Sequence, residues 1–394
     1  MAISKKIDEY MSRGSWIRKM FEEGVRLRKQ FGDENVFDLT LGNPVMEPPA
    51  EFKNKLFEEV KKSEPGMHRY MPNAGYEWVR EAVADYYREE TGLDFSAKNI
   101  TMTTGAAGAL NVVLKTILDP GDEVIIISPY FVEYSFYIDN HGGVTKVVNS
   151  NDDFSINISR IEEILSSKTK AVIINSPNNP TGVLYGEYSL RALGQVLLDV
   201  SKKYRKTIYL INDEPYRKII YDGKKASWIF NLYDNSIVVT SHSKDLAIPG
   251  ERIGHLAISP KASDVDKLSD GATFCNRTLG YVNAPALMQR VVAGLQKTVV
   301  DVGEYQKRRD YLYEKLSEMG YSVVKPQGAF YMFPRTPISD DTKFVKELQK
   351  KNVLVVPGSG FGCPGHFRIS FCVTFDTIKK SIRAFDTVAR QFGL

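Results

Sequence analysis

The feature of this sequence that most restricts its fold is a series of short apolar runs that alternate with longer helical segments. Three of these runs, at residues 123–128, 171–175 and 237–240, carry Ile and Val at consecutive positions. Strands that are apolar on both faces and are separated by crossover helices are typical of a mainly parallel sheet between layers of helices. Such sheets bind ligands at the carboxyl ends of their strands.

The alternation continues through the middle of the chain. We expect strands at residues 123–128, 144–148, 171–175, 207–211 and 236–241. We expect helices at residues 106–118, 131–140, 158–165 and 187–204. The pattern therefore predicts an α/β fold, and we assign its large domain to residues 46–285.

The two ends of the chain have a different pattern. Residues 1–31 are helix-like and rich in Lys and Arg, and a long helical stretch covers residues 286–319. Separate strand signals follow at residues 322–324, 329–333, 353–356 and 367–371, before a closing helix at residues 377–392. We therefore expect a smaller α+β domain built from residues 1–45 and 286–394 together.

Composition excludes several classes of protein. The 52 Lys and Arg against 48 Asp and Glu give a net charge of only +4, which argues against binding to nucleic acid or to a membrane surface. Three cysteines in 394 residues argue against a disulfide framework and fit a reducing compartment. The first ten residues have no apolar core of a signal peptide, and no His or Cys pair has metal-ligand spacing. We expect a cytoplasmic protein without a metal.

The most informative segment is residues 241–254, SHSKDLAIPGERIG, which follows an apolar strand. Lys244 would project from the carboxyl end of that strand, where burial lowers the pKa of an amine and makes it nucleophilic toward carbonyls. Arg252 lies between Gly250 and Gly254, which allow close backbone approach, and its guanidinium suits a phosphate dianion. Either residue alone is more often an ordinary surface residue, and the combination favours a site.

Two further segments also begin where an apolar strand ends. In residues 207–216, Asp213 could keep a pyridine nitrogen protonated, and Tyr216 could hydrogen-bond a phenolate oxygen. In residues 175–182, NSPNNPTG, Asn179 could donate its amide N–H to an oxyanion. Taken singly, both segments are also consistent with simple turns.

Two further candidate site segments are the start of a predicted helix and an arginine inside a predicted strand. Residues 104–108, TGAAG, open a helix with small residues, and such a helix N-terminus can bind phosphate. Arg368 lies inside a strand signal, where it needs an anionic partner, either a substrate carboxylate or a structural acid.

In chain order, from Leu41-Gly-Asn-Pro44 to Phe367-Arg-Ile-Ser370, these segments resemble the class I/II aminotransferases, which are pyridoxal 5'-phosphate enzymes of fold type I. The resemblance covers nearly the whole chain. It implies a seven-stranded sheet in the large domain and an aspartate aminotransferase-like homodimer with shared active sites. It also implies that the chain moves an amino group between an L-amino acid and a 2-oxo acid by a ping-pong mechanism, through an internal aldimine on Lys244.

The same resemblance assigns the other site residues. Asp213 pairs with the pyridine nitrogen, and Arg368 holds the substrate carboxylate beside Gly42. Tyr216 and Asn179 bind the phenolate oxygen, and Asn179 also lies beside the substrate. Tyr130 stacks on the cofactor ring, and Tyr70 reaches the phosphate in the neighbouring subunit. The remaining phosphate contacts are assigned to Gly105, Ala106, Ala107, Ser241, Ser243 and Arg252.

The sequence departs from the family pattern at His242 and Asp245, on either side of Ser243 and Lys244, and we favour a structural role for His242. The competing functions are a carbon–sulfur β-lyase or decarboxylase on the same scaffold, and a non-catalytic regulator that senses an amino acid. The amino acid is not readable from the sequence. Arg277 is a candidate cation for a dicarboxylic substrate, but an exposed structural role is more common, and Ala107 offers no charge.

Overall fold

The computed structural model describes residues 2–13 and 16–394. Its centre is a seven-stranded sheet in the order β2-β8-β7-β6-β5-β3-β4. All of these strands run parallel except β8, which is antiparallel to both of its neighbours. The strands are β2 (Ile100–Thr103), β3 (Glu123–Ser128), β4 (Val144–Asn149), β5 (Thr169–Asn175), β6 (Tyr209–Asp213), β7 (Ser236–Ser241) and β8 (Gly254–Ile258). This confirms the predicted α/β class and the mainly parallel sheet.

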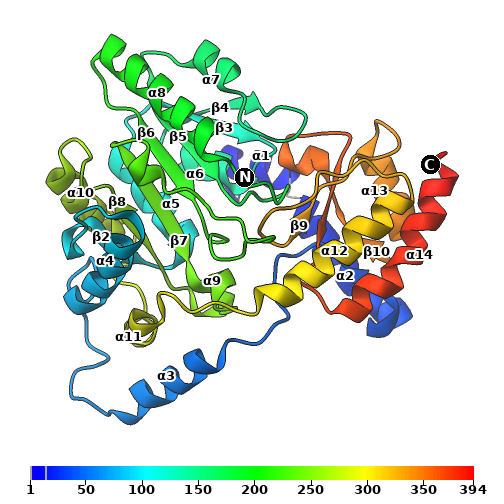
Figure 1. Cartoon of the computed structure of the whole chain (residues 1–394), viewed down its shortest axis with the longest axis horizontal. Helices are drawn as coiled ribbons and strands as arrows, with labels where there is room; N and C mark the ends of the chain where they lie inside the picture. The colour runs from blue at the N-terminus through cyan, green and yellow to red at the C-terminus, as the bar shows by residue number, and fades with distance from the viewer. Residues whose placement is uncertain (1, 14–15) are drawn as a thin grey trace.

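Helices cover both faces of this sheet, because the central strands are apolar on both sides. In β3, Ile125 and Ile127 belong to one buried core, whereas Val124 and Ile126 belong to the other. The first core includes residues of α4 (Glu77–Thr91), α7 (Ile158–Ile164) and α8 (Glu187–Tyr204). The second includes residues of α5 (Gly105–Ile117), α6 (Glu133–Asn140) and α10 (Val265–Thr278). The result is a sheet between two helical layers (Figure 1).

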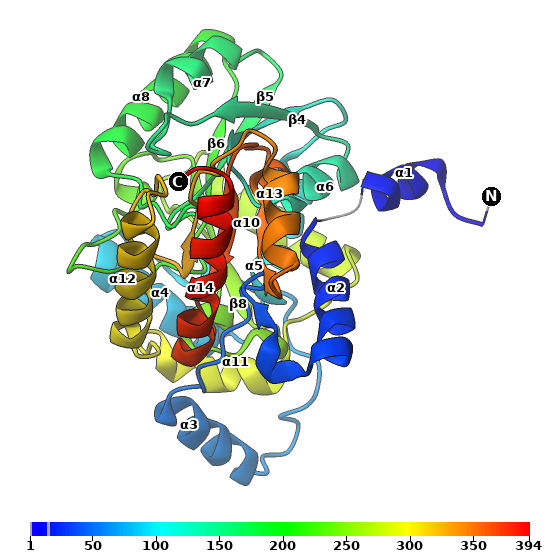
Figure 2. The same ribbon diagram turned by 90° about the vertical axis from the view of Figure 1, so that its right-hand side faces the viewer.

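A second group of elements, drawn from both ends of the chain, lies on one side of the central sheet and faces the viewer in Figure 2. β1 (Phe37–Asp38) pairs in parallel with β10 (Val353–Leu354), and β11 (Val356–Pro357), β12 (Phe367–Ser370) and β9 (Tyr331–Met332) form an antiparallel sheet. The accompanying helices are α2 (Trp16–Phe31), α12 (Val302–Glu318), α13 (Asp341–Gln349) and α14 (Phe375–Gln391). Buried residues from both ends of the chain share a core that is separate from the two cores of the central sheet.

The remaining helices are short or peripheral. They are α1 (Lys5–Arg13), α3 (Ala50–Lys61), α9 (His242–Asp245) and α11 (Ala286–Val292). Within the described residues, 3₁₀ turns connect the larger elements at Asp33–Asn35, Ala97–Asn99, Ile229–Asn231, Pro249–Glu251, Ala293–Leu295 and Gly358–Phe361. No helix in the described part of the chain is long and apolar enough to cross a membrane.

Two expectations for the C-terminal part were wrong. The helical stretch predicted over 286–319 is interrupted, because Asp301 starts α12 anew by accepting hydrogen bonds from the amides of Gly303 and Glu304. Residues 322–324 form no strand. Val323 and Val324 instead pack against two different cores, and the segment has no neighbouring strand to pair with. The sequence pattern also did not reveal β8 and α10.

The sheet brings three of the predicted segments to one edge. β5 ends at Asn175, β6 ends at Asp213 and β7 ends at Ser241, and all three strands run in the same direction. The N-terminus of α5 at Gly105 lies near this edge, because a Cβ atom built there would be 3.3 Å from Cζ of Arg252. Parallel strands therefore collect residues that are more than 60 positions apart in sequence.

Candidate active site

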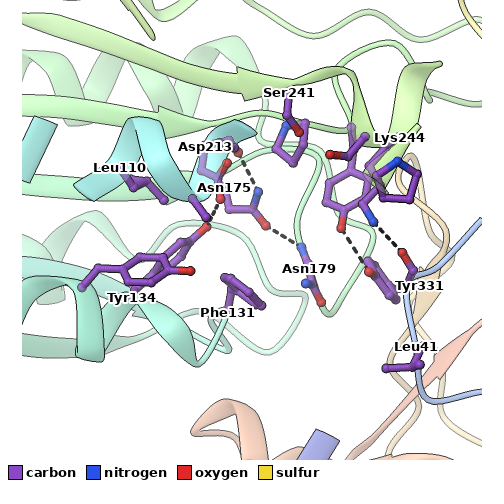
Figure 3. A pocket seen from close by; sticks show the side chains of 18 of the residues that line it. Leu41, Leu110, Phe131, Tyr134, Asn175, Asn179, Asp213, Ser241, Lys244 and Tyr331 are labelled. Carbon is purple, nitrogen blue, oxygen red and sulfur yellow. Dashed lines mark hydrogen bonds between the residues drawn. The ribbon is translucent and has the colours of Figure 1, made fainter. Parts of the chain in front are cut away.

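A cavity of about 280 Å³ lies at the carboxyl ends of β5, β6 and β7 (Figure 3). Its wall is mainly aromatic and aliphatic, with a few polar groups that converge on the interior. The lining residues are Leu41, Gly42, Ala106, Ala107, Leu110, Phe131, Tyr134, Tyr137, Asn175, Asn179, Asp213, Pro215, Tyr216, Ser241, Ser243, Lys244, Pro249, Arg252, Tyr331 and Arg368. Most of the residues predicted from sequence therefore lie in one wall.

Lys244 lies in α9, the short helix that directly follows β7. Its Nζ donates a hydrogen bond to the backbone oxygen of Gly42. Burial lowers the pKa of Lys244 to about 8, and the nearby charges of Arg252 and Arg368 act in the same direction. A substantial fraction of this amine is therefore neutral near physiological pH, as a nucleophile or general base requires.

Asp213, the last residue of β6, presents a half-satisfied carboxylate to the cavity. Its Oδ2 accepts a hydrogen bond of 2.6 Å from the hydroxyl of Tyr134, and its Oδ1 is buried without a partner. Burial raises the pKa of Asp213 to about 6, and the hydrogen bond from Tyr134 opposes that shift. A cationic N–H donor in the cavity would satisfy the free oxygen.

Asn175 connects the backbone of Asp213 to the neighbouring loop. Its Nδ2 donates to the backbone oxygen of Asp213 at 2.6 Å, and its Oδ1 accepts from the amide of Asn179 at 2.6 Å. The turn over residues 175–182 is also closed by the side chain of Asn178, which accepts from the amide of Thr181. The rigid turn predicted from the Asn and Pro residues is therefore present, and it holds Asn179 in the wall.

Arg368 comes from β12 and reaches the same cavity. Nη1 donates to Oδ1 of Asn179 at 2.9 Å, and Nη2 donates to the backbone oxygen of Thr40. Its Nε is buried without a partner, and no carboxylate of the described residues forms an ion pair with it. The guanidinium is only 2% exposed, so a buried positive charge is left without a counter-ion. A substrate carboxylate, rather than a structural acid, fits this environment.

The other end of the cavity combines Arg252 with the first turn of α5. Arg252 has a positive φ of 50° and donates to the backbone oxygen of Pro249 at 2.9 Å. Gly105 has a φ of 79°, which favours glycine, and a Cβ atom there would lie 2.8 Å from Nη2 of Arg252 and would displace the guanidinium. Ala106 and Ala107 follow on α5, and Ser241 and Ser243 face them from β7 and α9. A helix N-terminus, two hydroxyls and a guanidinium together suit a phosphate.

A pair of tyrosines lies between the two ends. The hydroxyls of Tyr216 and Tyr331 are 3.0 Å apart, and burial raises the pKa of Tyr216 well above its usual value. Gly42 packs so tightly against Tyr331 that a Cβ atom at position 42 would be 1.8 Å from its hydroxyl oxygen. Gly42 therefore serves the site through its backbone, and only glycine fits there.

Four predicted residues are not part of this wall, namely Gly105, Tyr130, Tyr70 and Arg277. Tyr130 packs beside Gly362, while the neighbouring Phe131 lines the cavity, so the aromatic ring in the wall is one position later than expected. The amide of Tyr130 donates to the backbone oxygen of Phe361, which belongs to a distant segment of the chain. This hydrogen bond turns residue 130 toward the loop that contains Phe361. Tyr70 is 88% exposed, and Arg277 is exposed with its guanidinium 5.2 Å from the ring of Phe274.

His242 also points away from the cavity. Its Nδ1 lies 3.2 Å from Oδ2 of Asp245, which Lys218 also binds at 2.8 Å. This group lines a second, small cavity of about 30 Å³ that includes His255 and Glu214. The unusual residues around Lys244 thus form a buried polar cluster behind α9, in agreement with the structural role favoured for His242.

Sequence reasoning did not single out several residues of the wall, notably Tyr134, Phe131, Tyr331 and Asn175. Phe131 and Tyr134 come three apart at the start of a predicted helix that follows a strand. That position after a strand, at the edge where the other segments meet, was the available signal. Asn175 lies in the segment whose pattern is also consistent with a simple turn, and Tyr331 lies in the strand signal at residues 329–333.

The arrangement fits pyridoxal 5'-phosphate. The unpartnered Oδ1 of Asp213 can accept from a protonated pyridine nitrogen, and Lys244 can react with an aldehyde. The close approach of Gly105 and Arg252 provides the anion-binding end. The fold and the cavity thus define a fold type I pyridoxal-phosphate enzyme.

Comparison with known proteins gives the family. The profile of the family "Aminotransferase class I and II" matches residues 34–385. The chain belongs to this family, and it is a pyridoxal-phosphate-dependent aminotransferase.

Similar curated proteins have related names. The chain is 34% identical over 354 residues to the "Probable aspartate/prephenate aminotransferase" of Thermus aquaticus, covering 88% of this chain and 90% of that protein. It is 31% identical over 408 residues to the "Aromatic-amino-acid aminotransferase 2" of Thermococcus litoralis, with 99% of both chains covered.

Solved structures show the same fold over the full length. An amino transferase from Eubacterium rectale superposes with a TM-score of 0.96 at 36% identity, with both chains covered completely. Aspartate aminotransferase from Thermus thermophilus with maleate gives a TM-score of 0.86 at 28% identity, covering 98% of this chain and 99% of that chain.

Proposed function

We propose specific roles for the residues of this cavity in amino-group transfer. Lys244 would hold the cofactor's aldehyde carbon, and Asp213 would hold its ring nitrogen. Arg252, Ser241, Ser243 and the first turn of α5 at residues 105–107 would hold its phosphate. Arg368 would bind the α-carboxylate of the amino acid. The observation that carries this proposal is that one cavity contains a pKa-lowered lysine, a carboxylate oxygen without a partner and an arginine without a counter-ion.

The bound cofactor supplies an electron sink that stabilises negative charge on the amino acid's Cα. The protein's own contribution is orientation and proton movement. Arg368, held by Asn179 and Thr40, would fix the amino acid by its carboxylate, and Lys244 Nζ would take the proton from Cα. Tyr216, paired with Tyr331, would donate its hydroxyl proton toward the cofactor's ring oxygen.

We also propose that two copies of the chain complete each other's site. Tyr70 is 88% exposed and lines a surface hollow together with Arg69, Tyr281 and Asn283, outside the cavity of its own chain. A large aromatic residue this exposed beside a hollow is typical of a contact surface. We further propose that residues 46–285 form one domain and that residues 1–45 and 286–394 together form a second, smaller domain. The three cysteines are free, which supports the cytoplasm as the location.

The experiment that tests the assignment of Lys244 is borohydride reduction of the reconstituted protein followed by peptide mapping. We expect the cofactor on the peptide that contains Lys244, and loss of both labelling and amino transfer in Lys244→Ala. Lys261→Ala, which changes a lysine in an exposed loop, is the matched control and should behave as wild type. Labelling of another lysine, or full activity of Lys244→Ala, would refute the assignment.

A panel of amino acids offered singly to the loaded enzyme separates transfer from elimination. Stoichiometric 2-oxo acid with no second substrate present supports amino transfer. Pyruvate and ammonia from cysteine conjugates, without formation of the amino form of the cofactor, would instead indicate a β-lyase.

A further inference from the structure

Tyr134 occupies a position in the cavity to which the proposed function gives no role. It lies in the first turn of α6, which follows β3, and its side chain enters the cavity from the side opposite Lys244 (Figure 3). The tyrosine is only 2% exposed, so a buried hydroxyl has been placed among apolar neighbours such as Leu110. Burial of a hydroxyl is unfavourable unless the group finds a partner.

That partner is the carboxylate of Asp213. The hydroxyl donates to Oδ2 at 2.6 Å, whereas the side chain of Asn175 donates to the backbone oxygen of Asp213 and not to its carboxylate. Tyr134 is thus the one side-chain donor to the Asp213 carboxylate within the described residues. Because Oδ2 is engaged, the second oxygen, Oδ1, is the one that has no partner among the described residues.

The donor itself is held firmly. The ring of Tyr134 belongs to the buried core beneath α5 and α6, and it packs edge-on against Phe131 at a centroid distance of 5.6 Å. Burial and the neighbouring Asp213 raise the pKa of Tyr134 well above its usual value. The phenol therefore stays protonated over the whole working range of pH and always acts as a donor.

We propose that Tyr134 is a positioning residue that acts through Asp213: it fixes the carboxylate with Oδ1 toward the cofactor's ring nitrogen and favours the ionised carboxylate. The proposal rests on the role proposed above for Asp213. Without this donor, the carboxyl group could rotate about its Cβ–Cγ bond and take up a proton more readily.

A pH dependence follows. The titratable groups that interact with Asp213 are Tyr134 and Tyr137 from α6, and Glu214 and Tyr216 from the loop after β6. Lys244, Arg252 and Arg368 supply the charges in the same cavity wall. Burial raises the pKa of Asp213 to about 6, and the Tyr134 hydrogen bond opposes that shift. Removing that bond must raise the pKa further, so protonation begins at a higher pH.

The test is equilibrium binding of pyridoxal 5'-phosphate to the apoprotein between pH 5 and pH 9. The wild type should lose affinity as the pH falls through about 6. In Tyr134→Phe, we expect affinity at pH 7 to fall by roughly tenfold and the onset of the loss to move up by about one pH unit. Tyr233→Phe is the matched control, because its buried hydroxyl donates to the backbone oxygen of Ile208 at 2.7 Å and its side chain does not line the cavity, so both quantities should stay unchanged.

A second readout reports the ring nitrogen directly. With ¹⁵N-labelled cofactor, the chemical shift should indicate a protonated nitrogen in wild type and Tyr233→Phe over the whole range, and partial deprotonation in Tyr134→Phe. A variant with only loosened packing would lose stability without moving this signal. An unchanged binding profile and an unchanged shift in Tyr134→Phe would overturn the proposal.

Asp213→Asn separates this inference from the proposed function. If Asp213→Asn binds the cofactor weakly at every pH while Tyr134→Phe behaves as wild type, only the role of Tyr134 fails. If Asp213→Asn is itself unaffected, the assignment of Asp213 fails. Should Tyr134→Phe not fold, 3-fluorotyrosine at position 134 provides a stronger donor of nearly the same size. It should move the onset to lower pH, and an unmoved onset would also overturn the proposal.

Discussion

Arg368 and Asn179 are 189 positions apart in sequence, yet Nη1 of the arginine donates to Oδ1 of the asparagine at 2.9 Å. The arginine comes from β12, in the small sheet of the C-terminal part, and the asparagine follows β5 of the central sheet. This hydrogen bond joins the proposed substrate-binding residue to the proposed cofactor-binding loop. Any movement of one sheet relative to the other would therefore change the geometry of the proposed carboxylate-binding site.

Arg368→Lys should weaken amino-acid binding far more than it slows turnover. A lysine keeps the charge but cannot donate in parallel to a carboxylate, to Asn179 and to Thr40 at once. We expect KM to rise by roughly 10- to 100-fold, with a smaller change in kcat. Steady-state kinetics would check this, with Arg390→Lys on the exposed face of α14 as the control. Equal KM values in both variants would contradict a carboxylate-binding role.

Lys244 should make the stability of the empty protein depend on pH. Its pKa is about 8 in the folded protein and about 10.4 in an unfolded chain. Between these two pKa values the unfolded chain binds more protons than the folded protein, so the free energy of unfolding increases with pH. Below this window the destabilisation caused by burying the charged Lys244 reaches its full value.

Lys244→Met removes this pH-dependent contribution to the stability of the protein. The difference in the free energy of unfolding between the apo forms should favour the methionine variant at pH 7 by at most roughly 3 kcal/mol and shrink toward pH 10. Denaturant titrations at several pH values would measure it. A difference that does not vary with pH would mean that the lysine is not desolvated.

Gly42→Ala should damage the site through packing alone. The new methyl group would meet the hydroxyl of Tyr331, which itself contacts Tyr216. We expect a loss of about 1–3 kcal/mol in the free energy of unfolding, together with a large loss of activity. Gly294→Ala is a suitable control, because a Cβ atom there has no neighbour within 4 Å. Thermal unfolding and activity assays would compare the two, and a silent Gly42→Ala would disprove the close approach.

Phe131, rather than Tyr130, should be the aromatic residue that supports the cofactor ring. Phe131→Leu should lower cofactor affinity by about tenfold, because it removes a ring from the cavity wall. Tyr130→Phe should have little effect, since that side chain packs beside Gly362. Cofactor titration of both apoproteins distinguishes the two positions, and the reverse order of effects would restore the original prediction.

The sequence alone determined the class of fold and most members of the site. Consecutive Ile and Val in residues 123–128 and 171–175 can only be accommodated by strands buried on both faces, and the intervening lengths allow only crossover helices. Once the strands run parallel, their carboxyl ends meet, so the segments after them converge without further information. Lys244 and Asp213 were predictable for this reason.

Only the tertiary structure decided which way individual side chains face. Tyr130 and Phe131 are adjacent aromatic residues, and a backbone hydrogen bond to Phe361 from a distant segment selected between them. The same holds for Tyr134, whose role depends on its 2.6 Å contact with Asp213, 79 positions away. Periodicity fixes which segments are buried, but orientation near a site is set by packing and hydrogen bonds between segments that the sequence pattern does not connect.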